Sequence, residues 1–368
     1  MQEDILYYPR RELAKSLIIS LNSGVTSAIT LFAPRRMGKT QFLLQDIVPE
    51  AQAADLNVFY FSFMDETASN ISEEFRRSLT VFAENAQKTS GIKKFLGGIT
   101  QVEFAGVGIS RETKQIEQER ISEIIARIAN LPYSTLLLLD EVQELARIAD
   151  TEGIIRSLRT GLDIYKNKVK VIFTGSSTNG LQAMFQNYKA PFFQFSHALD
   201  FPLLGKEFSD FLADIYYQRT HNQLDKDALY VLFQEMNSVP LYLRSVIQDM
   251  IINPNLSLDE AASYRLTQLN DKSQYLRQWQ QFSLLEQLLI ELILQGKKSL
   301  YSKENCNLIA EKLGVDKISP SKIQAALKKL FNQEIISKNN QSFLVINDAL
   351  FAEWIKEQIN NLFVVQQI

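Results

Sequence analysis

The first two hundred residues alternate between short, continuous apolar runs and longer stretches in which apolar residues recur with helical spacing. The apolar runs lie at residues 28–32, 57–63, 134–139 and 169–173. Continuous apolar runs are typical of strands buried on both faces of a sheet. Strands that alternate with helices build parallel sheets, so we predict an α/β domain with helices around a parallel sheet. The helices are expected at residues 9–23, 41–52, 72–86, 117–129 and 153–165.

Two further β-rich segments complete this domain. Residues 192–195 and 198–204 are expected to form the last strand of the sheet and its exit. Gly97 and Gly98, followed by the alternating segment 102–109, predict a small β-hairpin inserted near residues 97–110.

Beyond residue 204 the apolar spacing is helical almost throughout. Helical patterns at 208–217, 227–236 and 241–250 predict a helical lid. Three more helices and two short β runs follow, a succession that describes a winged helix. Those elements are expected at residues 284–294, 302–313, 321–332, 335–337 and 342–346, with a last helix at 349–363. The predicted domains are an α/β domain at 1–204, a lid at 205–281 and a winged helix at 282–368.

The segment between the first apolar run and the next helix, residues 33–41, reads as a phosphate-binding loop. Backbone N–H groups and a helix N-terminus can wrap a phosphate chain. Gly38 would let the backbone approach, Lys39 would reach the β- and γ-phosphates, and the Thr40 hydroxyl would coordinate Mg²⁺. The predicted nucleotide-binding residues are Ala33, Pro34, Arg35, Arg36, Met37, Gly38, Lys39, Thr40, Gln41 and Ser176.

Ala33 departs from the usual loop pattern, which begins with glycine. An extended Ala33 would cost little, whereas a positive φ at this position would strain the backbone. A chance match or an unrelated lysine-rich turn is the alternative explanation of the loop.

The apolar run at 134–139 ends in two acids, Asp140 and Glu141. Beside a phosphate site, Asp140 would hold Mg²⁺ and Glu141 would polarise the attacking water. The alternative is that both acids only cap the following helix.

Two other candidates are less specific. Ser176 and Ser177 end the strand segment predicted at 169–177, where they would sense the γ-phosphate or form a plain turn. Arg159 is the candidate arginine finger, acting in its own chain or from a neighbour, and an exposed helix charge is the alternative.

Composition excludes several classes of protein. The chain of 368 residues is 46% hydrophobic and 22% charged with a net charge of −3, which is typical of a globular protein and not of one whose whole surface binds nucleic acid. The single cysteine, Cys306, excludes an internal disulfide. The only two histidines, His197 and His221, have no second type of metal ligand spaced near them, so neither a zinc site nor a histidine-based triad is expected. Neither a membrane span nor a signal peptide is evident, so a cytoplasmic location is expected.

The motifs, taken together, resemble a known family. APRRMGKT, LLLLDEVQEL, VIFTGSS, DFPLLGKEFSDFL, SVPLYL and FLVINDALFAEWI occur in the order and spacing of the archaeal-type ATPases, which are P-loop proteins of the STAND and AAA+-like group. The resemblance implies phosphate and Mg²⁺ roles for Lys39 and Thr40, a metal carboxylate at Asp140 and a catalytic base at Glu141. Arg35 and Arg36 match the family's paired basic residues, with either phosphate contact or solvation as their role. Ala33 and the Ser238-Val239-Pro240 segment replace residues that are usually glycine-rich in the family.

These observations favour an Mg²⁺-dependent ATPase that hydrolyses slowly and acts as a conformational switch. ATP would bind between the sheet domain and the lid, and the winged helix would sense the state through a protein partner or the chain's own domains. Oligomerisation on ATP binding stays open.

Two alternatives belong to other classes. One is an ATP-modulated DNA-binding regulator, for which lysines surround the expected recognition helix, although acids are interleaved with them. The other is a degenerate nucleotide-binding scaffold, suggested by Ala33 and disfavoured by the pair of acids.

Overall fold

The chain divides into two compact units. The computed structural model describes residues 4–64, 71–88, 94–97, 119–147, 151–176, 181, 184–185, 190–269, 272–338, 343–348, 351–356 and 358. One unit is Tyr7–Leu203, and the other combines Met1–Leu6 with Leu204–Ile368. The two boundaries between the three domains proposed from the sequence stay predictions.

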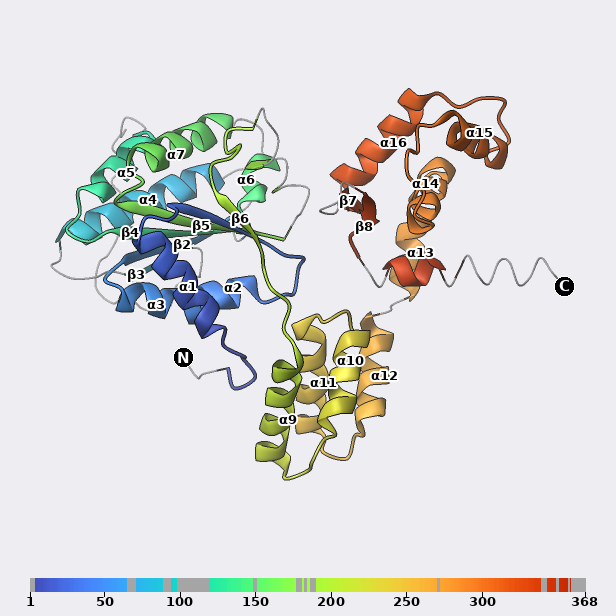
Figure 1. The fold of residues 1–368 in the computed structure, drawn as a ribbon, viewed down its shortest axis with the longest axis horizontal. Coiled ribbons are helices and arrows are strands. Elements are labelled where there is room, and N and C mark those ends of the chain that lie inside the picture. Colours follow the sequence, from blue (N-terminus) through green and yellow to red (C-terminus); the bar gives the residue numbers. More distant parts are fainter. Residues whose placement is uncertain are drawn as a thin grey trace. The chain divides into compact units, whose positions relative to one another are not determined.

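The first unit is built on one six-stranded parallel sheet (Figure 1). Its strands, in spatial order, are β3 (Lys94–Gly97), β2 (Asn57–Ser62), β4 (Thr135–Asp140), β5 (Val169–Gly175), β1 (Ala28–Phe32) and β6 (His197–Asp200). Every residue of β2, β4 and β5 is buried, as their continuous apolar runs predict. Since β5 pairs with both β1 and β4, the loops that follow these three strands open at the same edge of the sheet.

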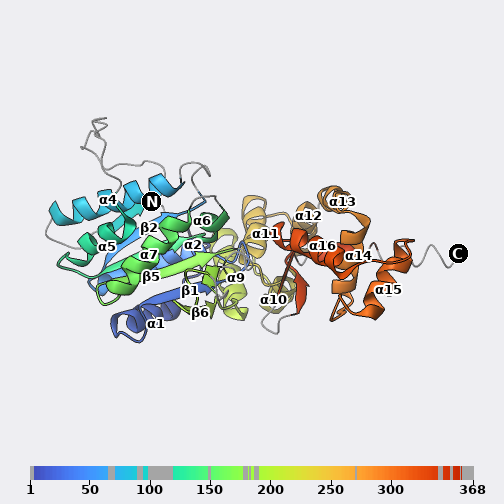
Figure 2. The same ribbon diagram turned by 90° about the horizontal axis from the view of Figure 1, so that it is seen from above.

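Helices cover both faces of this sheet. Figures 1 and 2 show α4 (Ile71–Lys88), α5 (Ile121–Ala129) and α7 (Glu152–Ile164) on one face, and α1 (Arg11–Asn22) and α3 (Val48–Ala53) on the other. Phenylalanine rings fill the core between β2 and α4. Phe61 and Phe75 have ring centroids 5.1 Å apart, and Phe59 and Phe82 lie 5.4 Å apart.

The helix that follows the phosphate-loop candidate contains one wide turn. α2 (Lys39–Phe42) continues into the π-helical segment η1 (Leu43–Ile47) before α3 begins. Pro49 in the first turn of α3 has no N–H, so it cannot complete the regular hydrogen-bond ladder. The π turn absorbs this mismatch within a continuous helix.

The second unit is helical apart from one small sheet. Four helices come first: α9 (Lys206–Thr220), α10 (Lys226–Glu235), α11 (Pro240–Ile252) and α12 (Leu258–Leu269). They are followed by α13 (Lys272–Gln280), α14 (Leu284–Leu294), α15 (Lys303–Lys312), α16 (Pro320–Asn332), β7 (Ile336–Lys338) and β8 (Leu344–Ile346). β7 and β8 pair antiparallel, so three helices and a two-stranded sheet occur in the predicted order, and the assignment of a winged helix stays a prediction. Among the described residues, no helix has both the length and the apolar character that a membrane crossing requires.

Three expectations need correction or lie beyond the described residues. The segment 192–195 is a turn and not a strand, because Phe192 is drawn into the core against Phe173 and Phe185. Gly97 is the last residue of the parallel edge strand β3, which the sequence patterns did not predict. The rest of the predicted hairpin, through residue 110, lies outside the described residues. Of the last predicted helix, at 349–363, residues 351–356 and 358 are described, and they are helical.

Glu286 connects two helices of the second unit and allows a first prediction. Its buried carboxylate accepts hydrogen bonds from the N–H and Oγ of Ser283 at 2.8 and 2.9 Å, and Lys329 Nζ lies 2.9 Å away. Burial acts to raise the pKa of Glu286, but the bonds from Lys329 and Ser283 outweigh it and hold the pKa below its ordinary value.

Glu286→Gln is therefore expected to lower the free energy of unfolding at pH 7 by about 2 kcal/mol, the magnitude of a buried hydrogen bond to a charged group. A carboxylate with a lowered pKa stabilises the fold above its ordinary pKa and loses that contribution at lower pH, so the difference should shrink below about pH 4. Urea unfolding followed by tryptophan fluorescence checks this, because both tryptophans, Trp279 and Trp354, lie in the core around α14. Glu311→Gln, on the exposed face of α15, is the control and should change stability by less than about 0.5 kcal/mol.

Candidate functional site

The loop after β1, the candidate phosphate loop, bends sharply before a helix begins. Gly38 adopts φ 87° and Arg36 adopts φ 68°, both in the left-handed region, and α2 begins at Lys39. Glycine is suited to the first of these positions, since a side chain there would be strained. Ala33 is absent from the residues with positive φ in the described chain, so its methyl group causes no backbone strain of the kind considered above.

Lys39 lies folded against its own loop. Its Nζ donates hydrogen bonds to the carbonyl oxygens of Ala33 and Pro34, each at 2.8 Å, and the side chain is only 5% exposed. Burial lowers the pKa of Lys39, while the nearby charges of Glu141 and Asp140 act in the opposite direction. The loop therefore holds a desolvated cation beside two acids, and an anionic group that reached Nζ would be strongly attracted.

Asp140 lies at the end of β4 with three hydroxyl groups around its carboxylate. Thr40 Oγ1 donates to Oδ2 at 2.6 Å, Tyr60 donates to the same oxygen at 3.2 Å, and Thr174 donates to Oδ1. Burial raises the pKa of Asp140, although the bonds from Thr174, Thr40 and Tyr60 counteract that effect. The contact between Thr40 and Asp140 joins the phosphate loop to β4 across a hundred residues of sequence.

Glu141 follows directly in a strained turn, with φ 55°. Its Oε2 accepts hydrogen bonds from the backbone N–H of Ser176 at 2.9 Å and from Ser176 Oγ at 2.7 Å. Gln143 Nε2 donates to the same oxygen at 2.5 Å. A non-glycine residue in the left-handed region is uncommon and persists where neighbouring groups hold it, as they do here.

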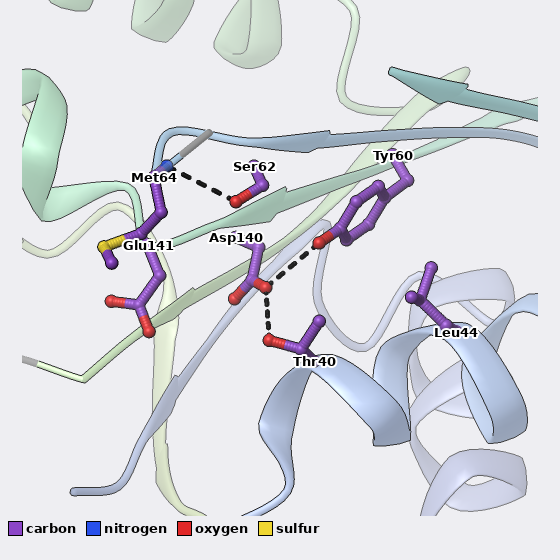
Figure 3. Close-up of a pocket in the computed structure, with 7 residues that line it drawn as sticks. All are labelled: Thr40, Leu44, Tyr60, Ser62, Met64, Asp140 and Glu141. Atoms are coloured by element: carbon purple, nitrogen blue, oxygen red, sulfur yellow. Dashed lines mark hydrogen bonds between the residues drawn. The ribbon is translucent and has the colours of Figure 1, made fainter. Parts of the chain in front are cut away.

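Two cavities adjoin at this edge of the sheet. One, of about 330 Å³, is lined by Thr40, Leu44, Tyr60, Ser62, Met64, Asp140 and Glu141 (Figure 3). The other, of about 280 Å³, is lined by Arg35, Arg36, Met37, Gly38, Lys39, Thr40, Gln41, Met64 and Glu141. Figure 3 shows the Asp140 carboxylate joined by hydrogen bonds to the hydroxyl groups of both Tyr60 and Thr40. Thr40, Met64 and Glu141 line both cavities, and the two adjoining cavities together are called the groove.

The structure brings most of the predicted residues to this groove. Arg35 reaches Ser176, with its Nε 3.4 Å from Ser176 Oγ, while Ala33 and Pro34 contribute the carbonyl groups that Lys39 contacts. Arg159 is not among the residues that line either cavity. Its guanidinium donates to the Pro191 carbonyl and lies 5.6 Å from the centroid of the Phe195 ring. Ser177 lies outside the described residues.

Three residues of the site were not predicted from the sequence patterns. Tyr60 and Thr174 lie within buried strands whose apolar character hides their hydroxyl groups, and Gln143 follows the two acids in what resembles an ordinary helix start. The hydroxyl groups of Tyr60 and Thr174 were the signal that could have identified them, because a hydroxyl group in a fully buried strand needs a hydrogen-bond partner.

The donor set suits Mg²⁺ held together with phosphate oxygens. Among the described residues, no three His, Cys, Asp or Glu side chains cluster closely enough to hold a metal by themselves. Mg²⁺ characteristically takes one or two protein oxygens and completes its shell with water and substrate phosphates. The Thr40 hydroxyl and the Asp140 carboxylate, 2.6 Å apart, fit that requirement.

Comparison with known proteins identifies the fold. No family model matches the sequence, and no curated protein matches it. The structure is similar to that of the Walker-type ATPase PABY2304 of Pyrococcus abyssi, with a TM-score of 0.61 and 14% identity, over 96% of this chain and 99% of that one. It is also similar to the ORC2 protein of Aeropyrum pernix in its ADPNP–ADP complexes, with a TM-score of 0.54 and 15% identity, over 99% of each chain. The ADP form of the same protein aligns at a TM-score of 0.53 over 98% of this chain and 95% of that one, also at 15% identity.

The chain therefore has the fold of the archaeal-type P-loop ATPases, as its motifs predict. At these identities the likeness establishes the fold, and the chemistry has to be argued from the site itself.

Proposed function

We propose that this protein binds ATP with Mg²⁺ and hydrolyses it slowly. The observation that carries the proposal is the 2.6 Å hydrogen bond between Thr40 and Asp140, which joins a phosphate loop to the acids at the end of β4. The ORC2 protein of similar fold is described with ADP and ADPNP, which supports an adenine nucleotide as the ligand. Magnesium, an ATP-dependent switch and a cytoplasmic location belong to the same proposal.

Each residue of the groove has a task in this reaction. The backbone of residues 34–39 would surround the phosphates, with Lys39 leaving the two loop carbonyls to contact the β- and γ-phosphates. Thr40 and Asp140 would hold Mg²⁺, which when bound neutralises phosphate charge. Glu141 would orient a water molecule and accept its proton as the water attacks the γ-phosphorus, while the bond from that phosphorus to the β–γ bridging oxygen breaks and ADP leaves with the bonding electrons.

We propose slow hydrolysis because Arg159 does not line the groove, and because the two arginines that do, Arg35 and Arg36, belong to the loop that would surround the phosphates. A finger that contacts the transferring phosphoryl group contributes roughly 10³ to 10⁵ in rate. Arg159, the candidate from the sequence, is engaged by Pro191 and Phe195 within its own unit. An arginine from a neighbouring molecule or a partner would then be the accelerating element, which suits a protein that acts as a switch.

The alternative of a DNA-binding regulator has weaker support than the ATPase switch. The lysines that would contact DNA phosphates in that alternative are Lys312, Lys317, Lys322, Lys328 and Lys329. Lys329 is bound to the buried carboxylate of Glu286, which makes it a structural residue of the helices around α14. We therefore favour a protein partner, or the chain's own domains, as the target of the second unit. Binding of random duplex DNA at low salt that weakens steeply as salt is added would reverse this preference.

The proposal is tested by thermal unfolding and by phosphate release, each measured with ATP and Mg²⁺. Binding at 100 times Kd should stabilise the first unit by about 2.7 kcal/mol, and the melting temperature should rise accordingly. No ATP-dependent shift in the wild-type protein would remove the proposal altogether.

Ala33→Gly provides a specific prediction about the departure from the loop pattern. Since Ala33 has no positive φ and contributes its carbonyl group, removing the methyl group should leave ATP affinity within about twofold. Titration of both proteins with a fluorescent ATP analogue measures the difference. A gain of tenfold or more in the glycine variant would mean that the methyl group obstructs the nucleotide.

A further inference from the structure

A fully buried amide side chain lies immediately behind the two acids. Gln143, the first residue of α6 (Gln143–Arg147), is 0% exposed. Its Nε2 donates to Glu141 Oε2 at 2.5 Å and lies 3.4 Å from Glu144 Oε1. Neither cavity is lined by Gln143, so it touches the groove only through its neighbour Glu141.

The backbone makes room for this amide. Gly175, the last residue of β5, does not have a positive φ, so glycine is not required there for its backbone conformation. A Cβ at this position would collide with Gln143 Oε1 and would lie 2.8 Å from two side-chain atoms of Leu181. Gly175 is thus needed for space, and the space is occupied by the Gln143 amide.

The direction of the amide is determined by the charge of Glu141. A reversed amide would place Gln143 Oε1 against the Glu141 carboxylate, and two acceptors at hydrogen-bond distance repel. In the observed direction Oε1 is buried and has no hydrogen-bond partner among the described residues. An unpaired buried acceptor is unfavourable, and such groups are uncommon outside functional sites. The fold tolerates this acceptor while using the other end of the amide to hold Glu141.

The hydrogen bonds on Glu141 are also one-sided. Among the described residues, all of those found on this carboxylate use Oε2: two come from Ser176 and one from Gln143. The turn is further fixed by a 3.0 Å bond from Val142 N to Thr174 O. With Oε2 held from two sides, Oε1 is the oxygen left to meet a water molecule in the groove that Glu141 lines.

We infer that Gln143 is a positioning residue for Glu141, holding Oε2 so that Oε1 acts as the base, and that Gly175 exists to admit its amide. This inference rests on the proposed ATPase function and adds a residue to it. The inference predicts that removing the contact between Gln143 and Glu141 lowers kcat. If the contact instead restrained a base that is competent without it, removing the contact would raise kcat.

The test is kinetic and uses the full chain. Gln143→Met keeps the buried volume and removes the donor, and it should lower kcat by about 10- to 100-fold, the scale of a misplaced catalytic group. KM for ATP should stay within about twofold, because Gln143 does not line the groove. Gln143→Asn, which draws the amide away from Glu141, should show the same pattern and serves if the methionine variant fails to fold.

A double-mutant cycle separates positioning from a structural role. In a Glu141→Gln background the base is already lost, so adding Gln143→Met should lower single-turnover hydrolysis no further. Equal losses in both backgrounds, an unchanged kcat, or a raised kcat would each overturn the inference while leaving the ATPase itself intact. A wild-type protein that neither binds nor hydrolyses ATP would instead overturn the proposed function.

Two glycines provide a matched pair of variants. Gly175→Ala should displace the amide and reproduce the fall in kcat seen for Gln143→Met. Gly153→Ala, in α7, is the control, because a Cβ there meets no atom within 4 Å. An unchanged kcat in a folded Gly175→Ala protein would contradict the role assigned to the amide.

Discussion

Lys39→Ala is expected to abolish ATP binding. In the structure its ammonium group lies on the carbonyl groups of Ala33 and Pro34, at the start of the loop that would surround the phosphates. Loss of its charge-assisted bonds to phosphate should cost about 3 kcal/mol, which corresponds to at least about 100-fold in affinity. Isothermal titration with ATP and Mg²⁺ measures the loss directly.

The Lys39→Ala protein should nevertheless fold. Burial lowers the pKa of Lys39, so at neutral pH the folded state carries a penalty for keeping this group charged; that penalty disappears when the lysine is removed. The melting temperature without nucleotide should therefore match or exceed that of the wild type. Lys168→Ala is the control, since Lys168 is exposed just before β5, at the end of the strand opposite the groove. An affinity of the Lys39→Ala protein within about tenfold of the wild-type affinity would show that the loop is not the phosphate site.

Glu141→Gln is expected to keep ATP binding and lose turnover. The amide oxygen can take the place of Oε2 and accept the two bonds from Ser176, so the turn should be preserved. The amide cannot accept a proton from water, and loss of a general base lowers rates by about 10² to 10⁴. We expect kcat to fall by about 1000-fold while the ATP-dependent thermal shift persists.

A control and a contrary outcome sharpen this test. Glu152→Gln alters an exposed acid on α7 that pairs only with Arg156 on the surface, and its kcat should stay within twofold. If the Glu141→Gln protein hydrolysed ATP at the wild-type rate, the base would have to be another group. Gln143 could then not act by positioning Glu141 as the base, and that inference would be wrong.

The periodicity of apolar residues was enough to predict most elements of the first unit. β1, β2, β4 and β5 were predicted within a residue or two, because a strand buried on both faces has a continuous apolar run whatever its neighbours are. The phenylalanines at 192–195 misled the same reasoning, since their apolar character serves the core around Phe173 and not a strand.

The helices α12 and α13 were not predicted. α12 has only a weak contrast between its apolar and polar faces, with polar residues throughout, and α13 is mostly polar, although its Tyr275 and Trp279 join the aromatic cluster around Phe351 and Trp354. Contacts with other helices, and not local spacing, determine these two segments.

The sequence by itself determined the chemical character of the site, because the residues that bind phosphate and metal are close together within two short segments. Gly38, Lys39 and Thr40 at a helix start, and two acids after an apolar strand, indicate phosphate and metal chemistry because backbone donors, a cation and carboxylates suit those ligands in any fold. Which groups hold Asp140 and Glu141 depends instead on distant strands meeting. The order of the sheet places β5 between β1 and β4, and only that order brings Thr174, Ser176 and the space at Gly175 against the acids. Pairing between strands far apart in sequence leaves no local pattern, so Tyr60 and Gln143 became visible as site residues only in the folded chain.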